Sequence, residues 1–175
     1  MMAYSLLTIV CPDRTGLISD ITAELFDLGI NLCDTSFAVL GTGAEFSAVL
    51  ETPSGLSEDG VLSHIRTVPG LDQAEITLKP FVYGTLRGES GTVTHHVSFE
   101  GDDQPGLVAR LTELLVDYEA NVVRMDTRII NRAAGRVYVV ELWVWIPENR
   151  SDACLAALNN TAATLGMGCS WNSTT

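Results

Sequence analysis

The sequence has 175 residues, of which 46% are hydrophobic and 18% are charged, so it can build a packed core and is not a disordered chain. Its 10 Lys and Arg stand against 22 Asp and Glu, and the net charge of −12 argues against a surface that binds nucleic acid directly. The start, "MMAYSLLTIV", lacks the basic region of a signal peptide, and no apolar run approaches the roughly 18 residues of a membrane span. We therefore expect a cytoplasmic protein with no membrane partner.

The first half of the sequence predicts four strands and two helices. Strands are indicated by runs of β-branched and aliphatic residues, and the first helix by apolar residues spaced three or four apart up to Gly29. A Gly-rich turn, "GTGA", joins the second and third strands, and Ser57 begins the second helix. The order is strand, helix, strand, strand, helix, strand, at residues 4–10, 17–28, 32–40, 45–51, 56–68 and 74–79.

The second half repeats the first. "PDRTGLISDITAELFDLGINL" matches "DDQPGLVARLTELLVDYEANV", so that Gly16 aligns with Gly106 and Asn31 with Asn121, each pair 90 positions apart. The predicted strands of this half are 93–100, 122–130, 136–146 and 168–172, and the helices are 106–119 and 151–165. We therefore predict an α+β fold of two ferredoxin-like βαββαβ domains, each an antiparallel sheet with both helices on one face. The predicted domains are 4–80 and 93–173, joined by a linker at 81–92.

Strand alternation predicts which side chains face the helices. Leu7 and Ile9, like Val97 and Phe99, should face them. On the strand that begins at Val122, alternation assigns Val123, Met125, Thr127 and Ile129 to the helix face and Val122, Arg124, Asp126 and Arg128 to the open face.

The strand "VYVVELWVWI" is apolar on both of its faces. Its open face would therefore expose a large apolar patch around Trp143 and Trp145. We expect this open face to form a homodimer with another sheet. The alternative is that the linker or the C-terminal tail covers it.

Each strand-to-helix loop offers groups that can bind a small ligand. Gly16 and Gly106 permit close approach to the backbone, and the unpaired amides of a helix start favour a carboxylate or phosphate. Asp13 and Asp103 could pair with an ammonium group, and Arg14 could bind a carboxylate. Asn amides at 31 and 121 both donate and accept. Pro105 suits the first helical turn.

The pattern "V-x-x-D-R-x-G-L-[IV]…G-I-N-L" resembles the ACT domain, and the doubled form resembles the family of tandem ACT proteins that includes the glycine cleavage system transcriptional repressor. The resemblance implies a non-enzymatic regulatory protein that senses an amino acid or similar small carboxylate between two domains. If it acts in transcription, the acidic balance and the missing helix-turn-helix point to a protein partner rather than to DNA, and we expect no cofactor. Thr15 stands where the family most often has Pro. The ligand residues that it implies are Asp13, Arg14, Thr15, Gly16 and Leu17 with Asn31, and Asp103, Gln104, Pro105, Gly106 and Leu107 with Asn121.

Other interpretations remain open at this point. The loop could be a plain turn with Asp or Thr as helix cap, and Cys11 could be a reactive thiol beside Arg14. The four cysteines lack zinc-site spacing and His95 and His96 point to opposite faces, so we expect reduced thiols and no metal site. An acylphosphatase-like phosphohydrolase on the same fold, or a pure assembly module, are the alternative functions.

Overall fold

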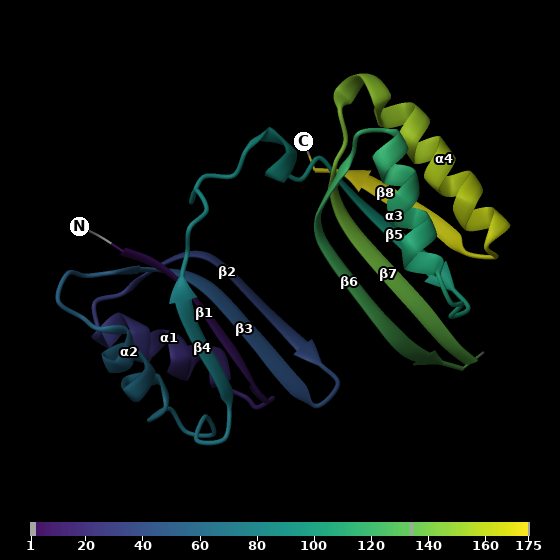
Figure 1. The fold of residues 1–175 in the computed structure, drawn as a ribbon. Helices are drawn as coiled ribbons and strands as arrows, with labels where there is room; N and C mark the ends of the chain where they lie inside the picture. The colour runs from purple at the N-terminus through teal and green to yellow at the C-terminus, as the bar shows by residue number, and fades with distance from the viewer. Residues whose placement is uncertain (1–2, 134, 175) are drawn as a thin grey trace. The chain divides into compact units, whose positions relative to one another are not determined.

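The computed structural model describes residues 3–133 and 135–174. The chain divides into two compact units, Met1–Thr85 and Leu86–Thr175, which we call unit 1 and unit 2. Each unit has one four-stranded antiparallel sheet and two longer helices in the order β-α-β-β-α-β (Figure 1). The predicted α+β fold of two ferredoxin-like domains is therefore confirmed.

Unit 1 has the strand order β2-β3-β1-β4 and a core between this sheet and its helices. Leu7 and Ile9 of β1 are fully buried with Ile21 and Leu25 of α1, as alternation and helical spacing predict. The second helix begins at Glu58, directly after Ser57, whose hydroxyl caps it by accepting from the Gly60 amide at 3.1 Å. It ends at Ile65, three residues before the predicted end. The elements are β1 (Ala3–Pro12), α1 (Leu17–Asp27), β2 (Asn31–Leu40), β3 (Gly43–Thr52), α2 (Glu58–Ile65) and β4 (Glu75–Pro80).

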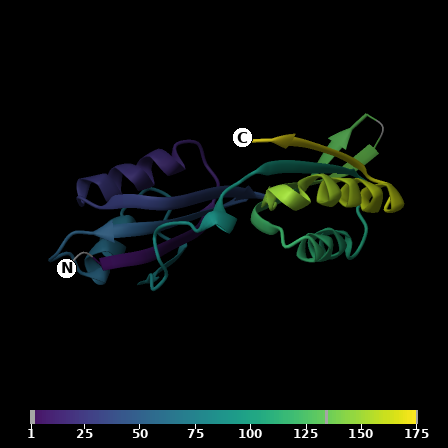
Figure 2. The same ribbon diagram turned by 90° about the horizontal axis from the view of Figure 1, so that it is seen from above.

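Unit 2 repeats this plan with the strand order β6-β7-β5-β8. Figure 2 shows its two longer helices on the same side of the sheet. Val97, Phe99 and Leu142 of this sheet are fully buried in the core of the unit. The elements are η1 (Glu89–Gly91), β5 (His95–Gly101), α3 (Leu107–Asp117), β6 (Asn121–Arg132), β7 (Gly135–Trp145), η2 (Glu148–Arg150), α4 (Ser151–Thr164) and β8 (Gly168–Ser173).

A β-bulge in β6 corrects the predicted alternation at one point. The register shifts between Val122 and Arg124, so Val122 pairs with the buried Val144 and packs against the core instead of facing outward. After the bulge, Arg124 pairs with Trp143, and the rest of the strand alternates as predicted. The extra residue reverses the parity, which an alternation rule applied to sequence alone cannot detect.

The open face of the unit 2 sheet exposes less aromatic surface than predicted. Trp143 and Trp145 are half-buried, and Trp143 stacks on the His96 ring with centroids 4.6 Å apart. From the strand on the other side, the Arg124 guanidinium lies 4.6 Å from the centroid of Trp143. The expectation of a large exposed patch was wrong, because neighbouring polar side chains cover the indole. Beside Trp145, η1 contributes Glu89 to a surface hollow, so part of the expected linker lies here.

His95 joins the sheet of unit 2 to α4. Its Nδ1 lies 2.9 Å from the Thr94 hydroxyl oxygen, which also accepts from the Ile146 amide and donates to the Val144 carbonyl. Because that hydroxyl has already used its proton, Nδ1–H is the donor, and Nε2 accepts from the Ser151 hydroxyl at 3.1 Å. Burial lowers the pKa of His95 below its ordinary value of 6.5, so the folded unit favours the neutral ring.

Lowering the pH should therefore reduce the free energy of unfolding of unit 2 through protonation of His95. The unfolded chain protonates this ring near pH 6.5, whereas the folded unit resists protonation, so the contribution is complete above about pH 6.5 and is lost as the pH falls through the lower folded-state pKa. Urea unfolding at several pH values between about 5 and 8 should show this slope in the wild type and a smaller one in His95→Gln. Parallel slopes in the two proteins would contradict the assignment.

Candidate functional site

The two strand-to-helix loops are built on the same glycine turn. Gly16 has φ 84° and ψ −4°, and Gly106 has φ 82° and ψ 1°, the values of the third residue of a type II turn. The Leu17 amide donates to the Arg14 carbonyl, and Leu107 does the same to Gln104, each at 3.3 Å. Glycine is required here because an L side chain is strained at this φ.

This turn corrects two expectations about how the helices begin. In both units the residue before the first helical turn is the glycine, and no side chain caps the helix, so the alternative of an Asp or Thr cap is wrong. Pro105 precedes Gly106 and occupies the second position of the turn, not the first turn of α3 as predicted. Proline fits because its fixed φ suits that position. The first amides of each helix are thus left without a side-chain acceptor.

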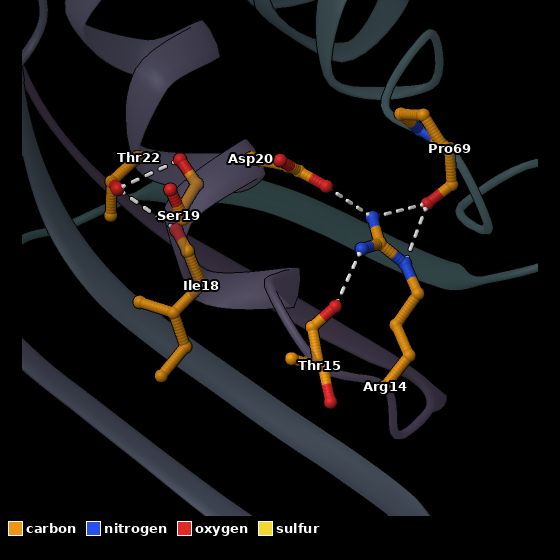
Figure 3. Close-up of polar contacts among 7 residues, drawn as sticks. All are labelled: Arg14, Thr15, Ile18, Ser19, Asp20, Thr22 and Pro69. Carbon is orange, nitrogen blue, oxygen red and sulfur yellow. Dashed lines mark hydrogen bonds and ion pairs between the residues drawn. The ribbon is translucent and has the colours of Figure 1, made fainter.

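Arg14 joins the first loop to the loop between α2 and β4. Its Nε and Nη2 donate to the Pro69 carbonyl at 3.1 and 2.7 Å, and Nη2 also forms an ion pair with Asp20 at 2.7 Å. Nη1 donates to the Thr15 carbonyl at 3.2 Å, so every nitrogen of the guanidinium has an acceptor within unit 1 (Figure 3). A Cβ on Gly70 would lie 3.3 Å from Nε. The structure therefore uses Arg14 as a clasp between two loops.

Gln104 makes the corresponding contact in unit 2. Its Nε2 donates to the Leu165 carbonyl at 3.0 Å, in the loop between the second helix and the last strand. Pro69 lies in the same loop of unit 1. The aligned residues Arg14 and Gln104 thus differ in charge but perform the same structural task, which the sequence comparison could not show.

The thiol beside the first loop is not primed for reaction. Cys11 is 7% exposed, and burial raises its pKa more than the nearby Arg14 lowers it. Burial also raises the pKa of Cys154 and of Cys169 to about 11. The structure therefore argues against the alternative of a low-pKa nucleophile or redox sensor at Cys11.

The two asparagines lie at the far end of their own sheets. Asn31 pairs with Glu51 and donates to its carboxylate at 3.1 Å, whereas the loop follows Pro12, which pairs with Gly43. Eight residues of strand separate the two ends of β3, about 25 Å. In unit 2, Asn121 likewise pairs with Trp145 and donates to the Ser90 carbonyl at 2.7 Å. Neither unit by itself brings its loop and its asparagine together.

Beside the second loop lies a small opening that sequence reasoning found only in part. Its volume is about 200 Å³, and its lining residues are Asp103, Ile129, Arg136 and Tyr138. Asp103 was predicted, but the other three come from the β6–β7 hairpin and were missed. The length of the hairpin was the available signal. In unit 2, β7 begins three residues before Tyr138, the residue that pairs with the last residue of β5. In unit 1, β3 begins at the residue that pairs with the last residue of β1.

Neither a protein-family model nor a curated protein matches the chain. Among solved structures, an unknown protein from Galdieria sulphuraria aligns over 100% of both chains with a TM-score of 0.74 at 17% identity. A structure provisionally described as a glycine cleavage system transcriptional repressor aligns over 99% of this chain and 98% of its own, with a TM-score of 0.64 at 14% identity. At these identities the matches show the fold alone, a tandem of two ferredoxin-like βαββαβ domains.

Within residues 3–133 and 135–174, no group of three or more His, Cys, Asp or Glu side chains is placed to hold a metal ion. None of the helices in the same ranges is both long enough and apolar enough to cross a membrane.

Removing the clasp should destabilise unit 1. Arg14→Ala should lower its free energy of unfolding by about 1–2 kcal/mol, the range for half-exposed, charge-assisted hydrogen bonds. Arg14→Gln should lose less, because unit 2 makes its clasp with glutamine. Arg66→Ala, an exposed control that ends α2 in the same unit, should change little. Urea denaturation measures all three, and equal losses for Arg14→Ala and Arg66→Ala would refute the clasp.

Proposed function

We propose that the protein is a non-enzymatic regulator that binds an amino acid or similar small carboxylate at its ACT loops and signals its presence to a protein partner. The tandem ACT fold supports a regulatory role, and the matched structure described as a glycine cleavage system transcriptional repressor suggests control of amino-acid metabolism. With a net charge of −12, the chain is better suited to a protein partner than to direct contact with DNA.

One observation carries the proposal: the second loop borders an opening, with charged side chains on its wall. Asp103 lines this opening, and α3 begins beside it without a capping side chain. In unit 1, by contrast, the Arg14 guanidinium lies 3.7 Å from the position of a Cβ on Gly16 and is held by Pro69 and Asp20. A Cβ on Gly106 would meet nothing within 4 Å. The second loop is therefore the working site in this proposal.

The asparagines enter the proposal as groups supplied by another domain copy. Because Asn31 and Asn121 lie about 25 Å of strand away from the loops of their own units, they can contact a ligand only at the loop of a neighbour. The ligand would then bridge two copies of the domain. Such bridging would make ligand binding alter the surface shown to a partner.

The phosphohydrolase alternative loses its main support. It needs Arg14 and Asn31 to contact the same phosphate. The Arg14 guanidinium is instead bound to the Pro69 carbonyl and the Asp20 carboxylate. Asn31 lies at the other end of the sheet. An enzyme would have to break the clasp and move the loop before binding substrate.

Isothermal titration with common amino acids, beginning with glycine and serine, tests the function. We expect saturable binding in the micromolar to millimolar range, about −8 to −4 kcal/mol. Gly106→Ala should weaken binding and lower stability by about 1–2 kcal/mol, because it strains the turn that shapes the loop. The control Gly88→Ala, at φ −71° with open space around it, should bind normally. An absence of binding at millimolar concentration for every amino acid would refute the proposal.

The homodimer through the open face of unit 2 also belongs to the proposal. Trp143 and Trp145 keep part of their surface there, although His96 and Arg124 cover some of it. Sedimentation velocity at micromolar concentration should show a dimer, and Trp145→Ser should shift it toward monomer. The control Trp171→Ser, at an exposed position on the edge strand β8, should leave the dimer intact. A wild-type monomer would remove this part of the proposal.

A further inference from the structure

We propose that the opening beside the second loop is a zwitterion site, in which Arg136 binds the carboxylate and Asp103 the ammonium of a free α-amino acid with a compact aliphatic side chain. This inference rests on the proposed function and names the ligand class of the same site. Arg136, Ile129 and Tyr138 then become specificity-determining residues on the β6–β7 hairpin.

The charge pairing on this hairpin singles out Arg136. The three arginines of the neighbouring strand β6 each form an ion pair with a carboxylate. Arg124 pairs with Asp126 at 2.8 Å, Arg132 with Glu100 at 3.0 Å, and Arg128 with Glu141. Arg136 has neither an ion pair nor a side-chain hydrogen bond to any residue in the described ranges. Among the arginines of the β6–β7 hairpin, Arg136 is therefore the one without a carboxylate partner in the described ranges.

Asp103 complements Arg136 across the opening. The Asp103 carboxylate also has no ion pair or side-chain hydrogen bond within residues 3–133 and 135–174, and the two side chains line the same opening without forming an ion pair with each other. A zwitterion satisfies both charges together. A simple carboxylate would satisfy Arg136 but bring its own charge toward Asp103, and a simple amine would do the reverse.

The walls and the size of the opening define the rest of the ligand. About 200 Å³ is below the range of sites for larger ligands and holds about seven waters, which suits a single small amino acid. Ile129 is 45% exposed and, with Tyr138, gives the opening an apolar side. An aliphatic side chain would cover Ile129, whereas glycine would leave it in water. Each methylene buried there should strengthen binding about fourfold.

Unit 1 has no equivalent of this site. In the strand register, Gly101 pairs with Tyr138 as Cys11 pairs with Ala44, so Ala44 stands where unit 2 has Tyr138. Two residues earlier, Thr42 stands where unit 2 has Arg136. One chain therefore carries one site.

Calorimetry with L-valine and its two truncated analogues tests the inference on the full chain. Valine should bind at one site per chain, and isovalerate, which lacks the ammonium, and isobutylamine, which lacks the carboxylate, should each bind at least about tenfold more weakly. Glycine should also bind at least about tenfold more weakly, since it leaves the apolar wall uncovered. Isovalerate or isobutylamine binding as tightly as valine would overturn the zwitterion assignment, and glycine binding as tightly would overturn the aliphatic one.

Matched variants assign the two charges. Arg136→Gln should weaken valine binding at least about tenfold. Asp103→Asn should also weaken valine binding, and it should reduce the difference in affinity between valine and isovalerate. The control Arg132→Gln, on the same hairpin but paired with Glu100 and outside the lining, should bind valine as the wild type does. Thermal unfolding of each variant identifies any that fails to fold. Arg136→Lys keeps the positive charge but not the two-pronged hydrogen bonding of the guanidinium, so it should lose an intermediate amount of valine affinity.

The outcomes separate this inference from the proposed function. Valine binding that is unchanged in both Arg136→Gln and Asp103→Asn would overturn the zwitterion site while leaving an amino-acid regulator with its site elsewhere. If no amino acid bound the wild type at millimolar concentration, the proposed function and the inference would both be refuted.

Discussion

The left-handed glycine turn between the first strand and the first helix of each unit is the constraint on which the other features depend. With φ near +80°, Gly16 and Gly106 end a type II turn and begin a helix that has no side-chain cap. The turn directs each helix back over the sheet, where its apolar side chains complete the core. It also places the residue two positions earlier where it can contact the loop that follows the second helix. Helix position, clasp and open amides therefore all follow from one backbone conformation.

The two units use this shared scaffold differently. In unit 1 a guanidinium fills the region beside the turn, anchored to Pro69 and Asp20, and the hairpin is short. In unit 2 the smaller Gln104 makes the clasp, and the longer β6–β7 hairpin brings Arg136 and Tyr138 to the loop. One loop has become mainly structural, while the other keeps an opening with unpaired charge. The two loops of the duplicated domain thus differ in packing and charge on the same fold, and we propose that only the second keeps a binding site.

Much of the fold could be predicted from the sequence, because periodicity and glycine positions report directly on backbone geometry. The internal repeat, the order of elements and the buried rows containing Leu7 and Val97 all followed from local patterns. The bulge after Val122 could not be predicted, because alternation assumes a regular ladder. Nor could the surroundings of Arg14 and Arg136, because both depend on groups that meet only after folding. The Pro69 carbonyl accepts hydrogen bonds from Arg14, and no carboxylate pairs with Arg136 within the described part of the chain.

The most direct test of the central claim, that the second loop is the working site, is to map amide chemical shifts on ¹⁵N-labelled protein during titration with L-valine. We expect saturable shifts confined to the second loop, residues 102–108, and the hairpin, residues 129–138. Amides of the first loop, residues 13–17, should stay in place, because Arg14 holds that loop closed. Shifts centred on residues 13–17, with residues 102–108 unchanged, would contradict the account.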